Sequence, residues 1–130
     1  MASLKQSDGS SFFELTNNAF SVFNLFHEDV RGRSPDHPIH FIEYYEMVDS
    51  ENVIEIRFDV EKATLTCTFN EDKRCNASYL FYDNPLDVMR YIEYLNKNFT
   101  YDYLGSRWMI YHCFISIKRI DGITSFMLCK

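Results

Sequence analysis

The sequence predicts an α+β fold, in which a single domain holds a mainly antiparallel sheet of about six strands and two helices, in the order α-β-β-β-β-α-β-β. Several segments alternate apolar and polar residues and are joined by short turns, which is typical of antiparallel sheets. Two other segments carry apolar residues at three- and four-residue spacing, as amphipathic helices do. The chain of 130 residues is 46% hydrophobic and 17% aromatic, which is enough for one core.

The first of the two helices is predicted near the N-terminus. Ser10 or Ser11 is its expected cap, and Glu14, three residues after Ser11, completes a capping box. Its apolar face recurs at helical spacing and consists of Phe12, Leu15, Ala19, Phe20, Val22, Phe23 and Phe26. We therefore expect this helix to pack one wide face on the sheet.

A hairpin of two strands, 52–60 and 63–69, is the most regular pattern in the chain. Apolar residues alternate with charged ones in the first strand and with threonines in the second, so one face is apolar and the other solvated. With a turn at Glu61-Lys62, the predicted register pairs Val60 with Ala63, Phe58 with Leu65, Ile56 with Cys67 and Ile54 with Phe69. Further strands are expected at 39–48 and 77–82.

The second helix begins with Asn84 as its predicted cap, Pro85 at the first helical position and Asp87 in the first turn. Its predicted buried stripe is Leu86, Met89, Ile92, Leu95 and Phe99. The last two strands close at Asp121-Gly122, a strong signal for a two-residue turn. This turn pairs Ile117 with Phe126 and Ile115 with Leu128.

The N-terminal segment and the cysteines predict a compartment. Residues 1–9 are polar and are expected to form a flexible N-terminus ahead of the domain at 10–130, without the apolar stretch of an export signal. No segment has the ~20 apolar residues of a membrane span. The four cysteines, Cys67, Cys75, Cys113 and Cys129, form no Cys-x-x-Cys pair. We therefore predict reduced thiols in a cytoplasmic protein that has no membrane contact.

Negative charge is concentrated in the segment 43–61, which we call the acidic window. It holds seven carboxylates against Arg57 alone, a sum of −6 that equals the net charge of the whole chain. Its carboxylates are Glu43, Glu46, Asp49, Glu51, Glu55, Asp59 and Glu61. Such a density on ordered strands creates a directional field that attracts a basic partner. A merely solvated strand face is the alternative explanation.

The sequence carries no recognisable catalytic signature. His37 and His40 are separated by a proline and lack the convergent spacing of zinc ligands, so we expect no metal and no cofactor. The segment Glu71-Asp72-Lys73 has a carboxylate-x-lysine form that metal-dependent nucleases use, but a charged turn explains it as well. We predict that the protein is not an enzyme. Its acidic balance, with a sequence pI near 5.1, also argues against direct nucleic-acid binding.

A second candidate surface is aromatic. The predicted strand 108–115 is apolar on both faces, and two helices cover only one face of a sheet. The other face then needs a curled sheet edge, loops, a homodimer partner or a small ligand. The candidate interface residues are Tyr44, Trp108, Ile110, His112 and Phe114.

Together these features predict a small acidic binding protein that occupies the basic surface of a protein partner. An immunity protein for a nuclease toxin and a phage counter-defence inhibitor of a nucleic-acid-binding protein both fit this description. The alternative is a dimerising or ligand-binding α+β domain that uses the aromatic sheet face.

Overall fold

The computed structural model describes residues 2–26, 28–30, 39–43, 52–110 and 112–130, and it describes side chains from Phe12 onward within these ranges, apart from 39–43 and Asn52. It confirms the α+β class. The elements are α1 (Ala2–Ser21), β1 (Ile39–Glu43), β2 (Asn52–Phe58), β3 (Ala63–Phe69), β4 (Cys75–Tyr82), α3 (Pro85–Asn98), β5 (Thr100–Asp102), β6 (Arg107–Ile110), β7 (Cys113–Ile120) and β8 (Ile123–Cys129).

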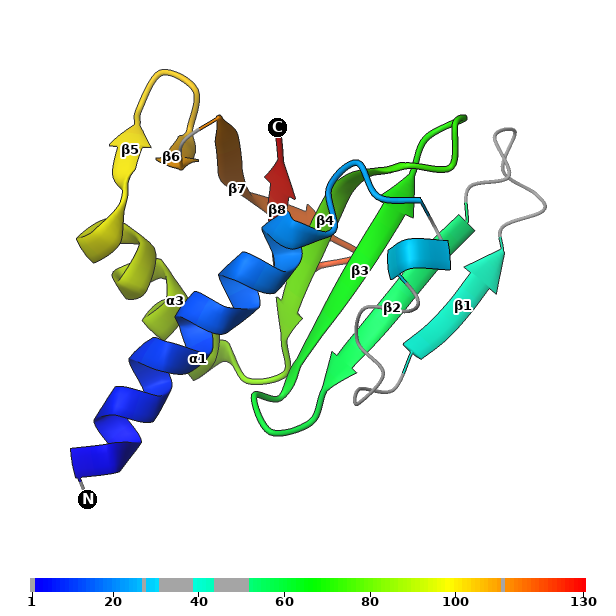
Figure 1. Ribbon diagram of the computed structural model, residues 1–130. Coiled ribbons are helices and arrows are strands. Elements are labelled where there is room, and N and C mark those ends of the chain that lie inside the picture. Colours follow the sequence, from blue (N-terminus) through cyan, green and yellow to red (C-terminus); the bar gives the residue numbers. More distant parts are fainter. Residues whose placement is uncertain (1, 27, 31–38, 44–51, 111) are drawn as a thin grey trace.

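The strands form one antiparallel sheet in the order β1-β2-β3-β4-β8-β7-β6-β5. The chain therefore builds the same unit twice, since a helix followed by a four-strand meander is α1 with β1–β4 and then α3 with β5–β8. The last strands of the two meanders, β4 and β8, pair at the centre of the sheet. Both helices pack on this centre and on each other, and in Figure 1 α1 crosses in front of the sheet beside α3.

The core lies between these helices and the sheet. From α1 it takes Leu15 and Ala19, and from the turn that follows it takes Val22, all three on the predicted apolar face. The Ser78 hydroxyl donates a hydrogen bond to the Ala19 carbonyl at 3.2 Å and joins α1 to β4. The largest fully buried side chains are Tyr91, Phe69, Phe126, Leu15, Ile54, Ile56, Leu65, Leu80, Leu95, Ile115, Leu128 and Val30.

The start predicted for the first helix is wrong. The helix α1 begins at Ala2, so Ser10 and Ser11 lie inside it and not at its start. At the other end, α1 stops at Ser21, and Phe26 bridges to Arg74 beside β4. The apolar spacing continues past the helix because the turn after Ser21 still places residues against the core.

The register of the first hairpin differs from the prediction by two residues. Phe58, not Val60, pairs with Ala63, and Ile54 pairs with Cys67. A four-residue turn at 59–62 replaces the two-residue turn, and Lys62 adopts a positive φ of 54° there. Because side chains alternate with period two, a two-residue shift leaves the predicted core face intact and moves only Val60 into solvent, where it is 90% exposed.

The second hairpin forms as predicted. Ile117 pairs with Phe126 and Ile115 pairs with Leu128. Asp121 and Gly122 take φ values of 52° and 80°, the positive angles that a type I′ turn requires.

Two further strands were not anticipated. The strand β5 pairs with β6 at the sheet edge, and the predicted strand 108–115 is in fact β6 and the start of β7, which pair with each other. The prediction of one continuous strand with two apolar faces is therefore wrong. Trp108 and Ile110 belong to the core of the domain itself.

The helix α3 has the predicted start but a different buried face. Asn84 is its cap, with the side-chain Oδ1 accepting a hydrogen bond from the Leu86 N–H at 2.9 Å. Tyr91 and Leu95 are the buried residues, whereas Leu86 and Met89 are 59% and 61% exposed. The Tyr91 ring packs edge-on against Phe126 at 4.7 Å. This contact turns the N-terminal part of the predicted stripe away from the core.

Candidate functional site

The described carboxylates of the acidic window do not gather in one patch. Glu46, Asp49 and Glu51 lie outside the described residues, and Glu43 ends β1 with its backbone opposite Asn52. Asp59 follows the other end of β2, seven residues away, which corresponds to roughly 20 Å of strand. The turn at 59–62 therefore forms a separate site, with Asp59 exposed and Glu61 half-buried.

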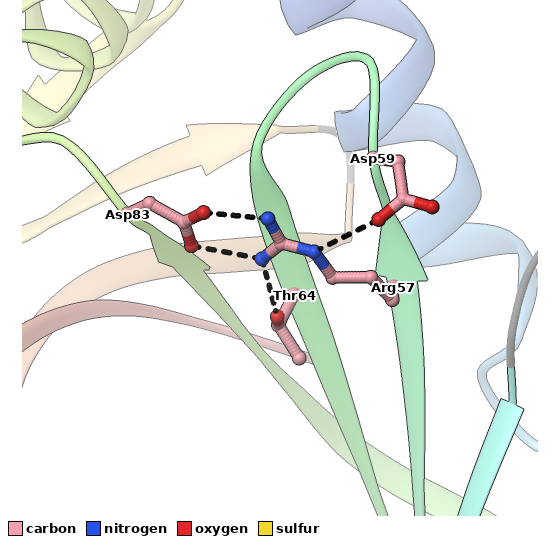
Figure 2. A network of polar contacts seen from close by, with 4 residues as sticks. All are labelled: Arg57, Asp59, Thr64 and Asp83. Atoms are coloured by element: carbon pink, nitrogen blue, oxygen red, sulfur yellow. Dashed lines mark hydrogen bonds and ion pairs between the residues drawn. The ribbon is translucent and has the colours of Figure 1, made fainter.

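Arg57 organises the polar contacts beside this turn (Figure 2). Its two terminal nitrogens donate hydrogen bonds to the two carboxylate oxygens of Asp83, at 2.8 and 2.5 Å. The Arg57 Nε donates to Asp59 at 3.3 Å, and one terminal nitrogen also donates to the Thr64 hydroxyl at 3.1 Å. The sole cation of the acidic window is thus bound to carboxylates of the protein itself.

The same contacts attach the β2–β3 turn to the start of α3. Asp83 lies between β4 and α3, and its backbone N–H donates to the Lys62 carbonyl at 3.0 Å. Hydrogen bonds and charge from Arg57 lower the pKa of the Asp83 carboxyl. The two-point carboxylate contact and the backbone bond therefore hold the turn 59–62 beside α3.

A hollow of about 460 Å³ opens next to Asp83, between α3 and the beginning of β8. Its lining is Tyr82, Asp83, Pro85, Val88, Met89, Gly122, Ile123 and Thr124. Met89 and Ile123 are both more than half exposed, so the apolar walls face water. Pockets of about 300–1,000 Å³ with apolar walls and few polar groups are typical ligand sites.

The Tyr82 hydroxyl is a buried polar group without a hydrogen bond among the described residues. The side chain is only 6% exposed, and its hydroxyl has no hydrogen-bond partner among the described residues. Burial raises the pKa of this phenol, and so do Tyr91 and the charges of Asp87 and Glu61. A buried hydroxyl without a partner is uncommon in a native protein and calls for an explanation.

These elements together make up what we call the turn-end site. It consists of the 59–62 turn, the start of α3 and the hollow, with Val60, Leu86, Met89 and Ile123 as its exposed apolar side chains. Sequence reasoning identified Asp59 and Glu61 but missed the hollow. The available signal was the exposed part of the α3 stripe, but nothing in the sequence places it beside β8.

Those of the other sequence candidates that the structure describes do not gather into one exposed site. Tyr44 and His37 lie outside the described residues. Trp108 and Ile110 are buried, whereas His112 is exposed and Phe114 lies half-buried under the Arg107 guanidinium, 3.8 Å from its ring centre. A partner contact by His112 or Phe114 stays a prediction.

The described part of the chain holds no group of side chains that supports a metal site or a nuclease site. Within it, no three side chains among His, Cys, Asp and Glu are grouped to hold a metal ion. Glu71 and Asp59 flank opposite ends of β3, so the two carboxylates do not meet. The four cysteines are free thiols. None of the described helices is long and apolar enough to span a membrane.

The chain matches no protein-family model, no curated protein and no solved structure. The geometry of the turn-end site is therefore the basis for a functional proposal.

The Arg57–Asp83 contact should make stability depend on pH. The pKa of Asp83 is lower in the folded protein than in the unfolded chain, so the contact stabilises above pH ~4 and is lost as the pH falls through the folded value. Both side chains are partly exposed, and we expect Asp83→Asn to cost at most about 1 kcal/mol at pH 7. Urea unfolding of wild type and Asp83→Asn at pH 7 and pH 3 measures this loss of stability. The difference from wild type should be smaller at pH 3 than at pH 7, and Asp121→Asn, which removes a carboxylate without a described ion pair, should show no such trend.

Removing the Tyr82 hydroxyl should not weaken the fold. Because the hydroxyl is buried without a partner, Tyr82→Phe should leave the free energy of unfolding unchanged or raise it by up to about 1 kcal/mol. Tyr91→Phe is the matched control, because it removes a buried hydroxyl that does have a partner and should destabilise. A loss of stability in Tyr82→Phe similar to that in the control would mean that the Tyr82 hydroxyl is satisfied in solution.

Proposed function

We propose that this protein binds a basic-surfaced protein partner through the turn-end site and acts by occupying that surface. The observation that supports this proposal most is that exposed apolar side chains and carboxylates occur on two neighbouring parts of one end of the fold, the hollow and the 59–62 turn. Met89 and Ile123 line the hollow and are more than half exposed, and the exposed Val60 stands with Asp59 and Glu61 on the turn that is bonded to Asp83. Apolar anchors with charged neighbours are the usual composition of a protein interface.

The apolar residues supply the contact area. Leu86 and Met89 lie in the first two turns of α3, Ile123 begins β8 and Val60 stands on the turn between β2 and β3. Three separate parts of the chain thus present apolar side chains at one end of the fold. Burying such side chains in a complex is worth ~25 cal/mol per Å² of apolar surface before the costs of association.

The carboxylates supply attraction and orientation. Asp59 is exposed and shares Arg57 with Asp83, while Glu61 makes no ion pair among the described residues. A basic partner would compensate these charges, and opposite charge mainly speeds encounter between proteins. Nucleases and other nucleic-acid-binding proteins carry basic clefts, so an inhibitor of such a protein is the partner class that we propose, in the manner of an immunity protein or a phage counter-defence protein.

Charge reversal on the turn should test this proposal. We expect Asp59→Lys/Glu61→Lys to reduce capture of the partner from extracts of the source cell at least tenfold at low salt, because the carboxylates steer association. The matched control is Glu71→Lys/Asp72→Lys, which reverses two exposed carboxylates on the β3–β4 turn at the opposite end of β3. Bound proteins are quantified by mass spectrometry at 50 and 300 mM salt.

The control variant should keep the partner, and high salt should narrow the difference between wild type and the turn variant. Equal capture by all three proteins would refute the proposal. Light scattering on the purified protein separates a further outcome, since a dimer lost in Asp59→Lys/Glu61→Lys would mean that a second copy of the chain takes the partner's place.

A further inference from the structure

The sheet has one face that no described helix covers. In β3, β4 and β8, residues of the core alternate with half-buried ones. The core residues share one cluster with side chains of α1 and α3, so the half-buried residues point to the side away from the helices. We call this side, with Thr66, Tyr79 and Met127 at its middle, the open face.

One row of side chains crosses the open face from an acidic end to a basic end. Residues paired directly across antiparallel strands lie on the same face, so the register defines the row. Arg107 belongs to it because its neighbour Trp108 is a residue of the core. All six side chains of the row are half-buried. From β2 to β6 they are Glu55, Thr66, Tyr79, Met127, Ser116 and Arg107.

The row is its own complement when it is reversed. A two-fold axis parallel to the strands, placed over the junction of β4 and β8, would set two open faces against each other and reverse the row. The carboxylate of Glu55 in one copy would then face the Arg107 guanidinium of the other, and Tyr79 would face Met127. An isologous interface between two copies requires such self-complementarity.

The neighbouring row supplies apolar surface to the same interface. It consists of Thr68, Ala77, Cys129, Phe114 and Met109, all half-buried. At ~4.8 Å per strand and ~3.3 Å per residue, about five residues of each strand in β2–β4 and β6–β8 cover about 500 Å² per copy. Two copies would bury about 1,000 Å², which is near the lower limit of a specific interface, so we expect a weak dimer.

The charges at the two ends of the first row are available to a second copy. Glu55 has no ion pair among the described residues. Arg107 Nε lies 3.6 Å from Asp102, and the guanidinium makes no hydrogen bond within the described chain. Its position over the Phe114 ring, 3.8 Å from the ring centre, holds the guanidinium on the open face. A carboxylate that approaches this face would therefore meet an oriented donor.

We propose that the protein forms a two-fold homodimer through its open face, with Glu55 of each copy paired with Arg107 of the other. This interface is separate from the turn-end site, which lies at the 59–62 turn and on the helix side of the sheet. Each dimer therefore carries two turn-end sites, and the partner that we propose for that site can bind to either.

The test is sedimentation equilibrium of the purified protein at 5–500 µM. The wild type should dimerise with a Kd between about 1 and 100 µM. Glu55→Arg and Arg107→Glu each bring like charges together twice in the dimer, and each should raise the Kd about tenfold or more. An equimolar mixture of the two variants should regain dimers, because both pairs are then opposite in charge in the mixed dimer.

Two charge reversals on α3 are the matched controls. Glu93→Arg changes an exposed carboxylate on the helix side, and Arg90→Glu removes a guanidinium that also lies 3.6 Å from a carboxylate, that of Asp87. Both should keep the wild-type Kd. Met127→Lys is a second test within the open face that does not alter the Arg107 contacts, and it should raise the Kd about tenfold or more by placing two ammonium groups in the interface. Circular dichroism shows whether each variant is folded.

A wild type that stays monomeric at 500 µM would overturn the inference and leave the open face to another occupant. A dimer that is unchanged in Glu55→Arg and Met127→Lys would place the interface elsewhere. If both charge variants are folded and their mixture stays monomeric, the two-fold pairing is wrong. The proposed function is tested independently, because Asp59→Lys/Glu61→Lys should lose the partner and keep the dimer, and a dimer lost in that variant would contradict the open face as the interface.

Discussion

Replacing Phe58 with aspartate should destabilise the domain by about 3–5 kcal/mol and leave much of the protein unfolded at 37 °C. Phe58 is 3% exposed and belongs to the core between the sheet and the helices. The substitution removes a large apolar side chain and places an uncompensated charge in its cavity. Because native domains are stable by only about 5–15 kcal/mol, such a loss is a large share of the total.

Urea unfolding followed by circular dichroism measures this effect, and the neighbouring residue provides the control. Asp59 points to solvent from the turn, and its contact with Arg57 is a single exposed one at 3.3 Å. Asp59→Ala should therefore cost less than about 0.5 kcal/mol. If the two variants lost similar stability, the assignment of Phe58 to the core face of β2 would be wrong.

That pair of variants tests which face of the strand is buried, and this is the part of the hairpin that the sequence predicts well. Alternation fixes the face, because a one-residue slip would put every apolar side chain of β2 into water. It does not fix the register, since a slip of two residues preserves the face. The decision between the two registers lies in the turn, where Lys62 takes a left-handed conformation that no pattern of apolar residues reveals.

The same distinction explains the remaining outcomes for the fold. The cap at Asn84 and the Asp121-Gly122 turn were predicted because each depends on a few adjacent residues. The buried face of α3 depends instead on Tyr91 meeting Phe126, which lies 35 positions further along the chain. The break between β6 and β7 escaped prediction for a similar reason, because both strands are apolar and read as one continuous strand.

The candidate site was predictable only in part. The acidic window drew attention to Asp59 and Glu61, but its other described carboxylates do not join them at the turn end. The hollow is created when β4 pairs with β8, which brings Tyr82 beside Ile123 although 41 residues separate them. A pairing of this sequence separation is set by the whole sheet and leaves no local trace in the sequence.

A second large effect is expected where α1 meets α3. The Thr16 hydroxyl donates a hydrogen bond to the Phe12 carbonyl at 2.7 Å, and its oxygen lies 2.7 Å from the Tyr91 hydroxyl. Since the Thr16 proton is already used, Tyr91 is the donor between the two. Both side chains are buried, and burial raises the pKa of Tyr91, so its phenol stays protonated and able to donate at neutral pH.

Thr16→Val keeps the shape of the side chain but leaves the buried Tyr91 hydroxyl without an acceptor, and we expect a cost of about 2 kcal/mol. Tyr91→Phe removes the donor, and because Thr16 keeps its bond to Phe12, it should cost only about 1 kcal/mol. Once Tyr91 is phenylalanine, Thr16→Val no longer strands a hydroxyl. The double variant should therefore lose at least about 1 kcal/mol less than the sum of the two single losses.

Unfolding in urea of the wild type, the two single variants and the double variant gives this coupling energy directly. Tyr94→Phe is the control partner, because the Tyr94 ring stacks on Tyr91 at 6.0 Å although no hydrogen bond joins its hydroxyl to Thr16. Thr16→Val and Tyr94→Phe should be additive within about 0.5 kcal/mol. Additive losses for Thr16→Val and Tyr91→Phe would show that the helices are held together by apolar packing alone, and that the Thr16–Tyr91 hydrogen bond contributes nothing specific to the docking of α1 on α3.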